Sequence, residues 1–210
     1  SANTSIEWTD RTWNPLIAVR KSDGKRGWHC TKVSPGCVNC YAEKINLRNL
    51  NCGTAFTYTR ENNAKVDFAL VNLDQPRSWR KPQRVFVNSM TDLFHEEVPD
   101  SLILQVFAAM VIAPQHTFQV LTKRAKRMHD FCAKYKPLLA NIHLGVSVED
   151  QARAEERIPW LMRTSASVRF LSMEPLLNAV DLEKAGGIWS DMNGKIRANF
   201  QQDNRLHWVI

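Results

Sequence analysis

The chain is organised around the stretch His29-Cys30-Thr31-Lys32-Val33-Ser34-Pro35-Gly36-Cys37-Val38-Asn39-Cys40-Tyr41-Ala42-Glu43, which places three cysteines within eleven residues. Only two residues separate Cys37 from Cys40, so both sulfurs can face one centre. Ser, Pro and Gly at 34–36 favour a turn that folds Cys30 back toward the same centre. The spacing therefore predicts a metal site with three thiolate ligands.

Three thiolates leave one position of a tetrahedral ion, or one iron of a cubane cluster, without a protein ligand. An open position indicates chemistry on a bound small molecule rather than a structural staple. Two other interpretations of the loop remain. One is a closed zinc knuckle in which Cys52 or His29 supplies the fourth ligand, and the other is three unrelated buried thiols.

The length of 210 residues, with 44% hydrophobic and 23% charged residues, is ordinary for one globular domain, which we place over residues 1–210. No run approaches the roughly 18 apolar residues of a membrane span, and residues 1–10 have neither the basic head nor the apolar core of a signal peptide. We therefore expect a cytoplasmic protein that does not contact membranes. The five cysteines agree, because closely spaced cysteines in a reducing cytosol are typical of metal or catalytic sites.

The chain is basic, with 28 Lys and Arg against 21 Asp and Glu and a net charge of +7. This balance favours a polyanionic partner such as nucleic acid or a phosphorylated substrate, although a basic surface without such a partner accounts for it as well. Two groups of cations are candidates for phosphate contacts, and the first surrounds an aromatic side chain that can stack on a base. The first basic cluster is Arg77, Arg80, Lys81 and Arg84 around Trp79, and the second is Lys123, Arg124, Lys126 and Arg127.

From residue 84 onward, short apolar runs rich in β-branched and aromatic residues alternate with helical patterns. This alternation predicts an α/β fold with a curled, mostly parallel sheet and outer helices, forming a full or partial (β/α) barrel. The βα repeats fill residues 84–210, behind the cysteine loop at 29–43. The expected strands are 84–89, 117–122, 142–147, 168–172 and the final run 206–210, and the expected helices are 99–113, 123–136 and 151–164.

The first 82 residues give weaker signals. Residues 1–27 predict an irregular lead-in with one short strand, and Cys40–Asn49 predicts a helix that opens directly behind the third cysteine. Residues 51–82 have no clear period, and we expect a variable connection with one short helix near Val66–Leu70. Because no helix follows the final run 206–210, we expect either an edge strand there or a native chain that continues.

The ligand of such a parallel sheet lies outside the carboxyl ends of the strands. The polar tails of the predicted strands are therefore candidates for ligand contacts. They are Asn88–Asp92, Thr122–Arg124, Ser147–Asp150 and Ser172–Pro175.

A three-cysteine loop that ends in Cys40-Tyr41 and precedes βα repeats resembles the loop of radical S-adenosylmethionine enzymes. More closely, the chain resembles a phage and prophage family of three-cysteine proteins that is distantly related to that superfamily, and the likeness covers nearly the whole chain. One departure is that six residues, where the superfamily has three, separate Cys30 from Cys37, and Pro35-Gly36 can absorb the extra length. The matching motifs are Ile6-Glu7-Trp8-Thr9, Trp13-Asn14-Pro15, Cys37–Glu43, Val87–His95, Leu121–Arg124, Leu144–Glu149 and Phe170–Leu177.

The resemblance implies the partial barrel of radical S-adenosylmethionine enzymes and a 4Fe-4S cluster on Cys30, Cys37 and Cys40, with S-adenosylmethionine at the fourth iron. Reductive cleavage of that cofactor gives a 5'-deoxyadenosyl radical, so an electron donor such as flavodoxin or ferredoxin is also implied. The resemblance further implies which strand ends hold the cofactor. Asn88, Ser89 and Met90 meet its methionine amine, and Thr122, Lys123, Ser147 and Glu149 meet its carboxylate and ribose.

Structural roles compete with these cofactor roles. Ser147 is also placed to cap a helix, with Asp150 completing a capping box and Glu149 complementing the helix dipole. Lys123 and Arg124 oppose the dipole of a helix that they open, so an anion is expected beside them. That anion is a cofactor carboxylate or a substrate phosphate, unless the two side chains form a solvated basic turn.

Together these observations favour a small radical S-adenosylmethionine enzyme of phage type that alters a nucleobase or a modified nucleotide in DNA. An isomerase that rearranges an amino-acid-modified thymine fits the charge and size, because an isomerase needs no second cluster and only Cys52 and Cys132 remain outside the loop. The alternative is a zinc-stabilised module that binds nucleic acid without catalysis and uses Cys52 as the fourth ligand. The sequence contains no named nucleic-acid-binding fold.

Overall fold

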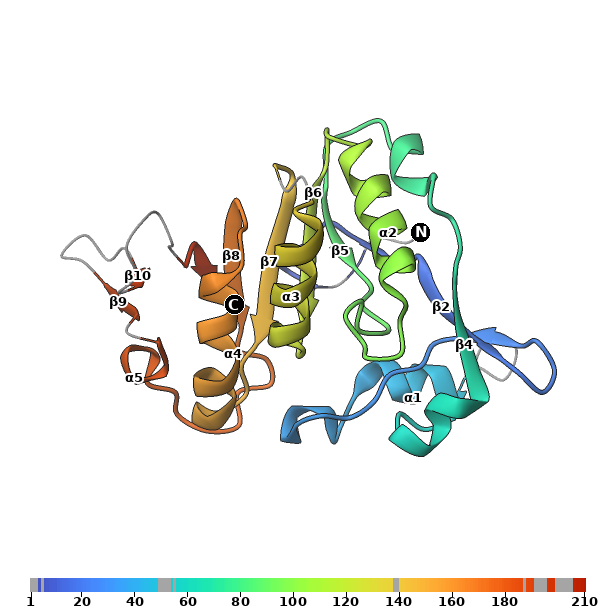
Figure 1. The fold of residues 1–210 in the computed structure, drawn as a ribbon, viewed down its shortest axis with the longest axis horizontal. Coiled ribbons are helices and arrows are strands. Elements are labelled where there is room, and N and C mark those ends of the chain that lie inside the picture. Colours follow the sequence, from blue (N-terminus) through green and yellow to red (C-terminus); the bar gives the residue numbers. More distant parts are fainter. Residues whose placement is uncertain are drawn as a thin grey trace. The chain divides into compact units, whose positions relative to one another are not determined.

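The structure is a computed structural model (Figure 1). It describes residues 4, 6–48, 54, 56–137, 140–186, 188–190, 196–198 and 206–210, with 188–190 and 196–198 described by their backbone alone. The chain divides into two compact units, Ser1–Phe118 and Gln119–Ile210, here called the N-terminal unit and the C-terminal unit. The organisation of residues 1–210 as one radical S-adenosylmethionine domain stays a prediction.

The N-terminal unit combines a pair of parallel strands with a small antiparallel sheet. Strand β1 (Arg11–Trp13) pairs in parallel with β5 (Arg84–Val87). Strand β2 (Leu16–Arg20) lies between β3 (Arg26–Gly27) and β4 (Val66–Leu70) in the antiparallel sheet. The helices of this unit are α1 (Tyr41–Arg48) and α2 (Asp100–Val111), with short 3-10 turns at Pro35–Cys37, Arg60–Lys65 and Gln75–Ser78.

Helix α2 shows how the sequence forms the core of this unit. Pro99 is its N-cap residue. Proline is tolerated there because the backbone N–H at this position would have no partner within the helix. Its apolar side chains recur at i, i+3, i+4 and i+7 and are each at most 2% exposed. The helix predicted over 99–113 is thereby confirmed as a core element. The buried stripe consists of Ile103, Val106, Phe107 and Met110.

The C-terminal unit consists mainly of parallel strands and helices. Strand β7 (Ile142–Ser147) pairs in parallel with β8 (Val168–Ser172), which pairs in parallel with β11 (Trp208–Val209). Strand β6 (Thr117–Thr122) spans the division between the units. In the described part of the chain, no helix is long and apolar enough to span a bilayer. The remaining elements are α3 (Ala125–Tyr135), α4 (Gln151–Arg163), α5 (Leu182–Gly186) and the antiparallel pair β9 (Ile188–Ser190) and β10 (Ile196–Ala198).

Close packing between β7 and β8 depends on a glycine. Gly145 is the register partner of Phe170, and a Cβ atom added to Gly145 would lie 2.5 Å from the Phe170 ring. That ring in turn stacks on Trp208 of β11, with centroids 4.2 Å apart and planes 4° from parallel. A side chain at position 145 would require this stacked ring to move, which explains a glycine inside an apolar strand.

The parallel strands form a six-stranded sheet in the order β1-β5-β6-β7-β8-β11. The predicted α/β class with a mostly parallel sheet is therefore confirmed. The predicted strands at 84–89, 117–122, 142–147, 168–172 and 206–210 are found as β5, β6, β7, β8 and β11, and the three predicted helices are found as α2, α3 and α4. A closed barrel is not shown, and the partial (β/α) barrel stays a prediction.

Two predictions for the first 82 residues are wrong. Val66–Leu70 is strand β4 rather than a short helix, and residues 1–27 contain β1, β2 and β3 rather than one strand. In Figure 1, β4 runs beside β2, and the two pair over five residues from Leu16 with Leu70 to Arg20 with Val66. Strands β1 and β4 are stabilised by partners distant in sequence, β5 and β2, so their own residues carry little periodic signal. The predicted strand 84–89 ends at Val87, because Asn88 has a φ of 58°.

Candidate cofactor site at the cysteine loop

The cysteine loop is a series of tight turns between Ser34 and Cys40. The Cys37 N–H donates to Ser34 O at 2.9 Å, and the Val38 N–H donates to Pro35 O at 3.1 Å. A longer bond of 3.4 Å joins Cys40 N to Cys37 O. The turn predicted at 34–36 is therefore present, and it coils the segment that carries the second and third cysteines.

Helix α1 begins directly behind the third cysteine. Cys40 O accepts the Lys44 N–H at 3.2 Å, so Cys40 is the residue that opens the helix. The N-terminal end of a helix carries positive partial charge, which stabilises a thiolate placed there. The helix predicted over Cys40–Asn49 is confirmed as far as Arg48, and Asn49 lies outside the described residues.

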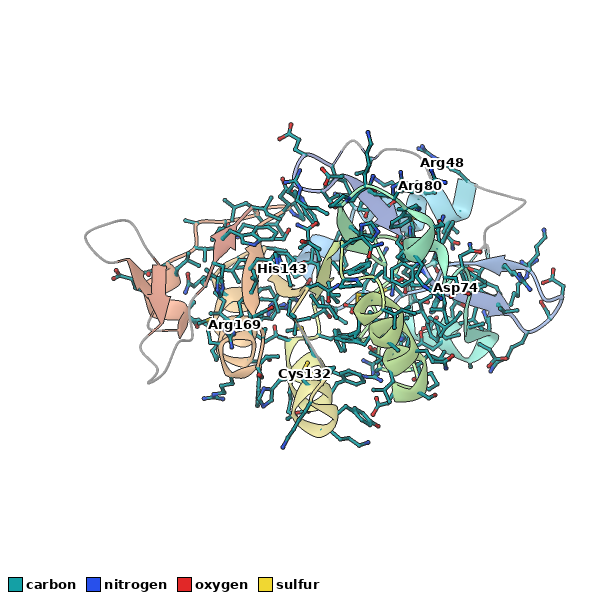
Figure 2. The ribbon with its side chains drawn as sticks, turned by 90° about the horizontal axis from the view of Figure 1, so that it is seen from above. Arg48, Asp74, Arg80, Cys132, His143 and Arg169 are labelled. Atoms are coloured by element: carbon teal, nitrogen blue, oxygen red, sulfur yellow. The ribbon has the colours of Figure 1, made fainter. Side chains whose placement is uncertain are left out.

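The loop cysteines differ in exposure from the fourth cysteine that the structure describes. Cys30, Cys37 and Cys40 are partly exposed, whereas Cys132 on α3 is buried (Figure 2). Burial raises the pKa of the Cys132 thiol to about 12, so this thiol stays protonated at neutral pH. Cys52, the predicted alternative ligand, lies outside the described residues. Among the described thiols, those of the loop are thus the ones open to a metal or a cluster.

Two of the loop cysteines share an apolar cluster with a residue of the strand end behind β5. The side chains of Cys30 and Cys40 therefore lie beside Met90, one of the residues that the sequence predicts to bind a cofactor. The cluster shields one side of each thiol from water. We call it the Tyr58 cluster, and it consists of Ala42, Tyr58 and Met90, with Trp28, Cys30 and Cys40 packed against it.

Three hydrogen bonds connect the segment behind β5 to the cysteine loop and its surroundings. Tyr41 Oη donates to Ser89 O at 2.6 Å, and Tyr58 Oη donates to Met90 O at 2.9 Å. Thr91 Oγ1 donates to the backbone oxygen of His29 at 2.5 Å. The structure therefore brings Cys30 and Cys40, two of the three predicted metal ligands, together with Met90, and it bonds the helix that follows Cys40 to Ser89.

Two asparagines fix the conformation of this segment. Asn88 adopts a left-handed conformation, and its Oδ1 accepts the Leu16 N–H at 3.3 Å. Asn14 Oδ1 accepts the Met90 N–H at 3.1 Å and the Ser89 hydroxyl at 3.2 Å. Asn88 Nδ2 is buried and has no hydrogen-bond partner among the described residues. A buried donor of this kind is costly to leave unpaired, and a bound ligand can satisfy it.

The two phenols that hold the segment remain protonated. Desolvation of the hydroxyl raises the pKa of Tyr41 to about 12, with Cys40 adding to the rise and the bond to Ser89 opposing it. Desolvation also raises the pKa of Tyr58, and Cys30 and Cys40 contribute to that rise. Tyr58 is 2% exposed, whereas half of the Tyr41 ring is exposed. Both phenols are neutral donors at pH 7, and the bond made by Tyr58 is the better shielded from water.

Glu43 supports the loop from inside α1. Its buried carboxylate places Oε2 2.7 Å from Lys32 Nζ, and its Oε1 accepts the Tyr58 N–H at 2.8 Å. The Lys32 N–H also donates to Tyr58 O at 3.1 Å. These bonds join the stretch between Cys30 and Cys37 to the helix and to Tyr58. Sequence reasoning missed both Glu43 and Tyr58, since a lone acid in a helix and an aperiodic stretch gave no functional signal.

His29 and His95 belong to a buried hydrogen-bond network. His29 Nε2 lies 2.8 Å from Asn63 Oδ1, which also accepts from Thr31 Oγ1 at 2.9 Å. Thr31 Oγ1 lies 2.8 Å from His95 Nε2, and both imidazoles are 0% exposed. Burial lowers the pKa of His29. The zinc-knuckle interpretation with His29 therefore leaves only its Nδ1 atom for a metal. His95 lies in the loop that follows β5 and is likewise buried.

In the described part of the chain, no group of three or more His, Cys, Asp or Glu side chains is arranged so that it could hold a metal ion. The three-thiolate centre therefore stays a prediction. The chemistry of the loop fits a 4Fe-4S cluster, because three partly exposed thiols lie on one loop and the third opens a helix. The buried amide donor of Asn88, unpaired among the described residues, lies two residues before Met90, which packs with Cys30 and Cys40 in the Tyr58 cluster.

A second group of predicted residues lies at the strand ends of the C-terminal unit. Glu149, 0% exposed, places Oε2 2.7 Å from Arg157 Nη1 and Oε1 3.8 Å from Lys123 Nζ. Arg157, on α4, also donates to Ser147 O at 2.9 Å. The structure thus brings Lys123, Ser147 and Glu149 together, and it shows that the anion expected beside Lys123 includes the chain's own Glu149. We call this group the Glu149 cluster.

The capping role predicted for Ser147 falls to another residue. Asp150 caps α4, because its Oδ1 accepts the Arg153 N–H at 2.8 Å, while Ser147 is buried at the end of β7. Thr122 has a similar local role, since its Oγ1 accepts the Arg124 N–H at 2.9 Å before α3 begins. Local caps therefore account for part of the polar pattern at these strand ends.

The first basic cluster is partly engaged within the chain. Arg84 Nη2 lies 2.9 Å from Asp10 Oδ1, and the Arg11 guanidinium lies 4.7 Å from the centroid of the Trp79 ring. Trp79 therefore already has a cation on one face of its ring. The other members of the cluster, Arg77, Arg80 and Lys81, are exposed, and Figure 2 labels Arg80.

One comparison with known proteins gives a match. A family model described as "Protein of unknown function (DUF5131)" matches residues 3–210, a span that includes the cysteine loop and both strand-end groups. No curated protein and no solved structure matches the chain. The function must therefore be argued from the residues themselves.

Proposed function

We propose that the chain, which belongs to the DUF5131 family, is a radical S-adenosylmethionine enzyme. Membership of this family assigns no activity, so the proposal is based on the candidate site. In this proposal Cys30, Cys37 and Cys40 hold a 4Fe-4S cluster, and the segment Asn88–Met90 binds S-adenosylmethionine. When bound, the two groups supply a 5'-deoxyadenosyl radical that takes a hydrogen atom from the substrate. The proposal includes the partial (β/α) barrel of that superfamily as the form of the parallel sheet.

The observation that carries the proposal is the connection between the cysteine loop and the strand end behind β5. Phenols from the loop helix and from Tyr58 donate to Ser89 O and Met90 O, and Cys30 and Cys40 pack against the same cluster as Met90. Ligands of parallel α/β sheets bind at the carboxyl ends of strands. A zinc staple needs no such connection, whereas a cofactor bridging a metal centre and a strand end does.

Residues of the chain have three tasks in this reaction. The N-terminal end of α1 favours the thiolate form of Cys40. The carbonyls of Ser89 and Met90 each keep a second lone pair for the amine of the cofactor, while the Asn88 amide donates to its carboxylate. The Tyr58 cluster excludes water from one side of the thiols.

We propose that the substrate is a nucleobase of DNA. More specifically, we propose that the enzyme isomerises a thymine that carries an amino acid. The net charge of +7 and the exposed cations of the first basic cluster support a polyanionic substrate. The hydrogen atom to be abstracted lies next to the amino-acid nitrogen, where a neighbouring lone pair stabilises the substrate radical. The contacts of Thr122, Lys123, Ser147 and Glu149 to the carboxylate and ribose stay a prediction of the resemblance and are not part of this proposal, because Glu149 is buried and paired with Arg157 and Lys123.

Anaerobic purification of the full chain, followed by reconstitution with iron and sulfide, tests the cluster. We expect iron and acid-labile sulfide in equal amounts, with a broad visible absorption that dithionite bleaches. Alanine at Cys30, Cys37 or Cys40 should abolish loading, while Cys132→Ala, at a buried thiol on α3, should keep it. A colourless protein that binds zinc, and loses it in Cys52→Ala, would support the non-catalytic nucleic-acid-binding module instead.

Cofactor cleavage tests the reaction. Loaded protein reduced with dithionite should convert S-adenosylmethionine to 5'-deoxyadenosine, and Asn88→Ala should weaken binding of the cofactor without changing the iron content. DNA that contains an amino-acid-modified thymine should accelerate this conversion and yield a nucleoside of unchanged mass and altered retention. A loaded protein that binds the cofactor but never cleaves it would contradict the proposal.

A further inference from the structure

Exposed apolar side chains gather at the cysteine loop. Nine large hydrophobic residues of the described part of the chain are exposed, and five of them lie within residues 33–47. Concentrated apolar exposure of this kind marks an interaction site, whereas single exposed apolar residues are normal. The five are Val33 at 37%, Val38 at 66%, Tyr41 at 51%, Ile45 at 45% and Leu47 at 37%.

The outer face of α1 combines apolar and cationic side chains. Exposed residues at i, i+3, i+4 and i+7 along this helix lie on one face, and the buried residues lie on the opposite face. Figure 2 labels the last of the exposed residues, Arg48, at the end of α1. The exposed set is Tyr41, Lys44, Ile45 and Arg48, and the buried set is Ala42, Glu43 and Asn46.

This face carries positive charge without exposed negative charge. Glu43 is the sole acid between residues 29 and 48, and it is 6% exposed and paired with Lys32. Lys44 and Arg48 are exposed and make no ion pair with any described residue. A partner with acidic side chains around an apolar centre complements such a surface.

The aliphatic character of the face favours a protein over a nucleic acid. Protein–DNA interfaces are polar and strongly cationic, whereas protein interfaces have an apolar centre with a polar rim. Val38 and Ile45, each at least 45% exposed, supply apolar side chains here, and the exposed cations of α1 are only Lys44 and Arg48. Val38 also lies between Cys37 and Cys40, so a partner on this face contacts the loop that carries the proposed cluster.

We infer that the loop face, defined as Val33, Val38, Tyr41, Lys44, Ile45 and Arg48, is the docking surface for an acidic protein. The inference rests on the proposed function, in which this protein is the reductant, a reduced flavin or iron-sulfur protein. The partner loses one electron and the cluster held by the three cysteines gains it, so the partner must approach the cysteine loop closely. Small interfaces steered by charge are typical of such electron-transfer encounters.

Two reductants separate docking from chemistry. Dithionite is a small ion that needs no docking surface, whereas reduced flavodoxin, an acidic flavin protein used as the probe, must bind the loop face. In Ile45→Ser and in Lys44→Glu/Arg48→Glu, iron content and dithionite-driven formation of 5'-deoxyadenosine should match wild type. Flavodoxin-driven formation should fall at least about tenfold, and the wild-type flavodoxin-driven rate should decrease as salt rises.

Matched controls repeat each kind of substitution elsewhere. Ile112→Ser, at a residue 54% exposed, and Lys134→Glu, at an exposed position of α3, should leave both reductants effective. Loop-face variants that accept electrons from flavodoxin at the wild-type rate would overturn the inference. Loss of DNA affinity with unchanged flavodoxin response would overturn it too, and would assign the face to nucleic acid.

The affinity of the full chain for oxidised flavodoxin, measured by calorimetry, decides docking without any turnover. The loop-face variants should bind at least about tenfold more weakly than wild type and than the two controls. Equal affinities, or no binding by wild type, would sink the docking surface. Failure of the proposed function has a different signature, namely a wild-type protein that forms no 5'-deoxyadenosine even with dithionite.

Discussion

The cysteine-loop region and the Glu149 cluster both lie at the ends of parallel strands, yet they satisfy their polar groups in opposite ways. At the cysteine loop, neutral phenols donate to the backbone of Ser89 and Met90, and the three thiols are partly exposed. In the Glu149 cluster, charged side chains pair with one another, and Glu149 and Arg157 are at most 1% exposed.

This difference separates a region with unused binding capacity from one whose groups bind each other. Buried charges are costly unless they are paired, and the Glu149 cluster meets that requirement with its own residues. The cysteine-loop region differs in having thiols that reach solvent, whereas both regions keep a buried donor without a partner among the described residues, Asn88 Nδ2 in the first and Arg157 Nε in the second. Substitutions in the Glu149 cluster should therefore affect stability first, and substitutions at the cysteine loop should affect ligand binding first.

Arg157→Met should have the largest effect on stability, because it removes one partner of the buried ion pair in the Glu149 cluster. The variant leaves a fully buried Glu149 carboxylate without its partner at 2.7 Å, while Lys123 stays at 3.8 Å. Removal of one partner of a buried pair costs about 3–5 kcal/mol, which urea unfolding would measure as a lower free energy of unfolding. The double variant Glu149→Met/Arg157→Met is the control, and it should recover most of the loss because neither buried charge remains, while the partly exposed Lys123 that also loses Glu149 can be solvated.

A loss below about 1 kcal/mol in Arg157→Met, which is the range of exposed ion pairs, would show that the two regions do not differ in this way. Glu149 would then be a solvated carboxylate that is free to meet a cofactor, as the resemblance to radical S-adenosylmethionine enzymes implies.

Gly145→Ala should have the second-largest effect on stability, because the Phe170 ring occupies the space that a Cβ atom at position 145 would need. The new methyl group would lie 2.5 Å from the Phe170 ring, which is held by stacking on Trp208. Overpacking of this kind costs about 1–3 kcal/mol of unfolding free energy. In the Gly145→Ala background, Phe170→Leu should restore part of the loss although it destabilises the native chain. Strictly additive losses would show that the ring is not the obstacle.

Tyr58→Phe should have a smaller effect on stability, and it tests how well the phenol hydrogen bonds at the cysteine loop are shielded from water. The lost phenol leaves Met90 O without its buried donor, at a cost of about 1–2 kcal/mol. Tyr41→Phe is the matched variant and should cost less, about 0.5 kcal/mol, because its half-exposed ring lets water replace the phenol. On the proposed function, equilibrium dialysis should show weaker S-adenosylmethionine binding in Tyr58→Phe than in Tyr41→Phe. Equal effects would mean that the two bonds are equally shielded.

The fold was predictable where an element carries its own signal. Strands β5 to β8 are nearly continuous apolar runs, as expected of a covered parallel sheet, and α2 shows a clear helical period. Strand β4 was not predictable, because its partner β2 lies far away in sequence and its alternation is weak. The left-handed Asn88 that ends β5 early was also missed, although asparagine tolerates that conformation better than most residues.

Sequence reasoning found the residues of the candidate sites but not their partners. Arg157 had an available signal, since its spacing from Ala154, Ile158 and Leu161 puts a charge on the apolar face of α4. A charge there needs a buried counter-charge, and Glu149 is that group. Tyr58 had no such signal, because its bond to Met90 joins an aperiodic stretch to a strand end 32 residues away.

The smallest effect expected is a pH dependence from His143 of β7, labelled in Figure 2. Burial, followed by the nearby charge of His207, lowers the pKa of His143 below its ordinary 6.5. As pH falls below 6.5, the unfolded chain takes up a proton that the folded chain excludes, so the free energy of unfolding should decrease until the folded pKa is reached. Because His143 is partly exposed, His143→Gln should remove only about 0.5 kcal/mol of this decrease, measured by urea unfolding at neutral and mildly acidic pH. Burial also lowers the pKa of His29 beside the cysteine loop, so part of the slope should persist in the variant. A slope that is unchanged by His143→Gln would assign all of the pH dependence to other groups, among which His29 beside the cysteine loop is the first candidate.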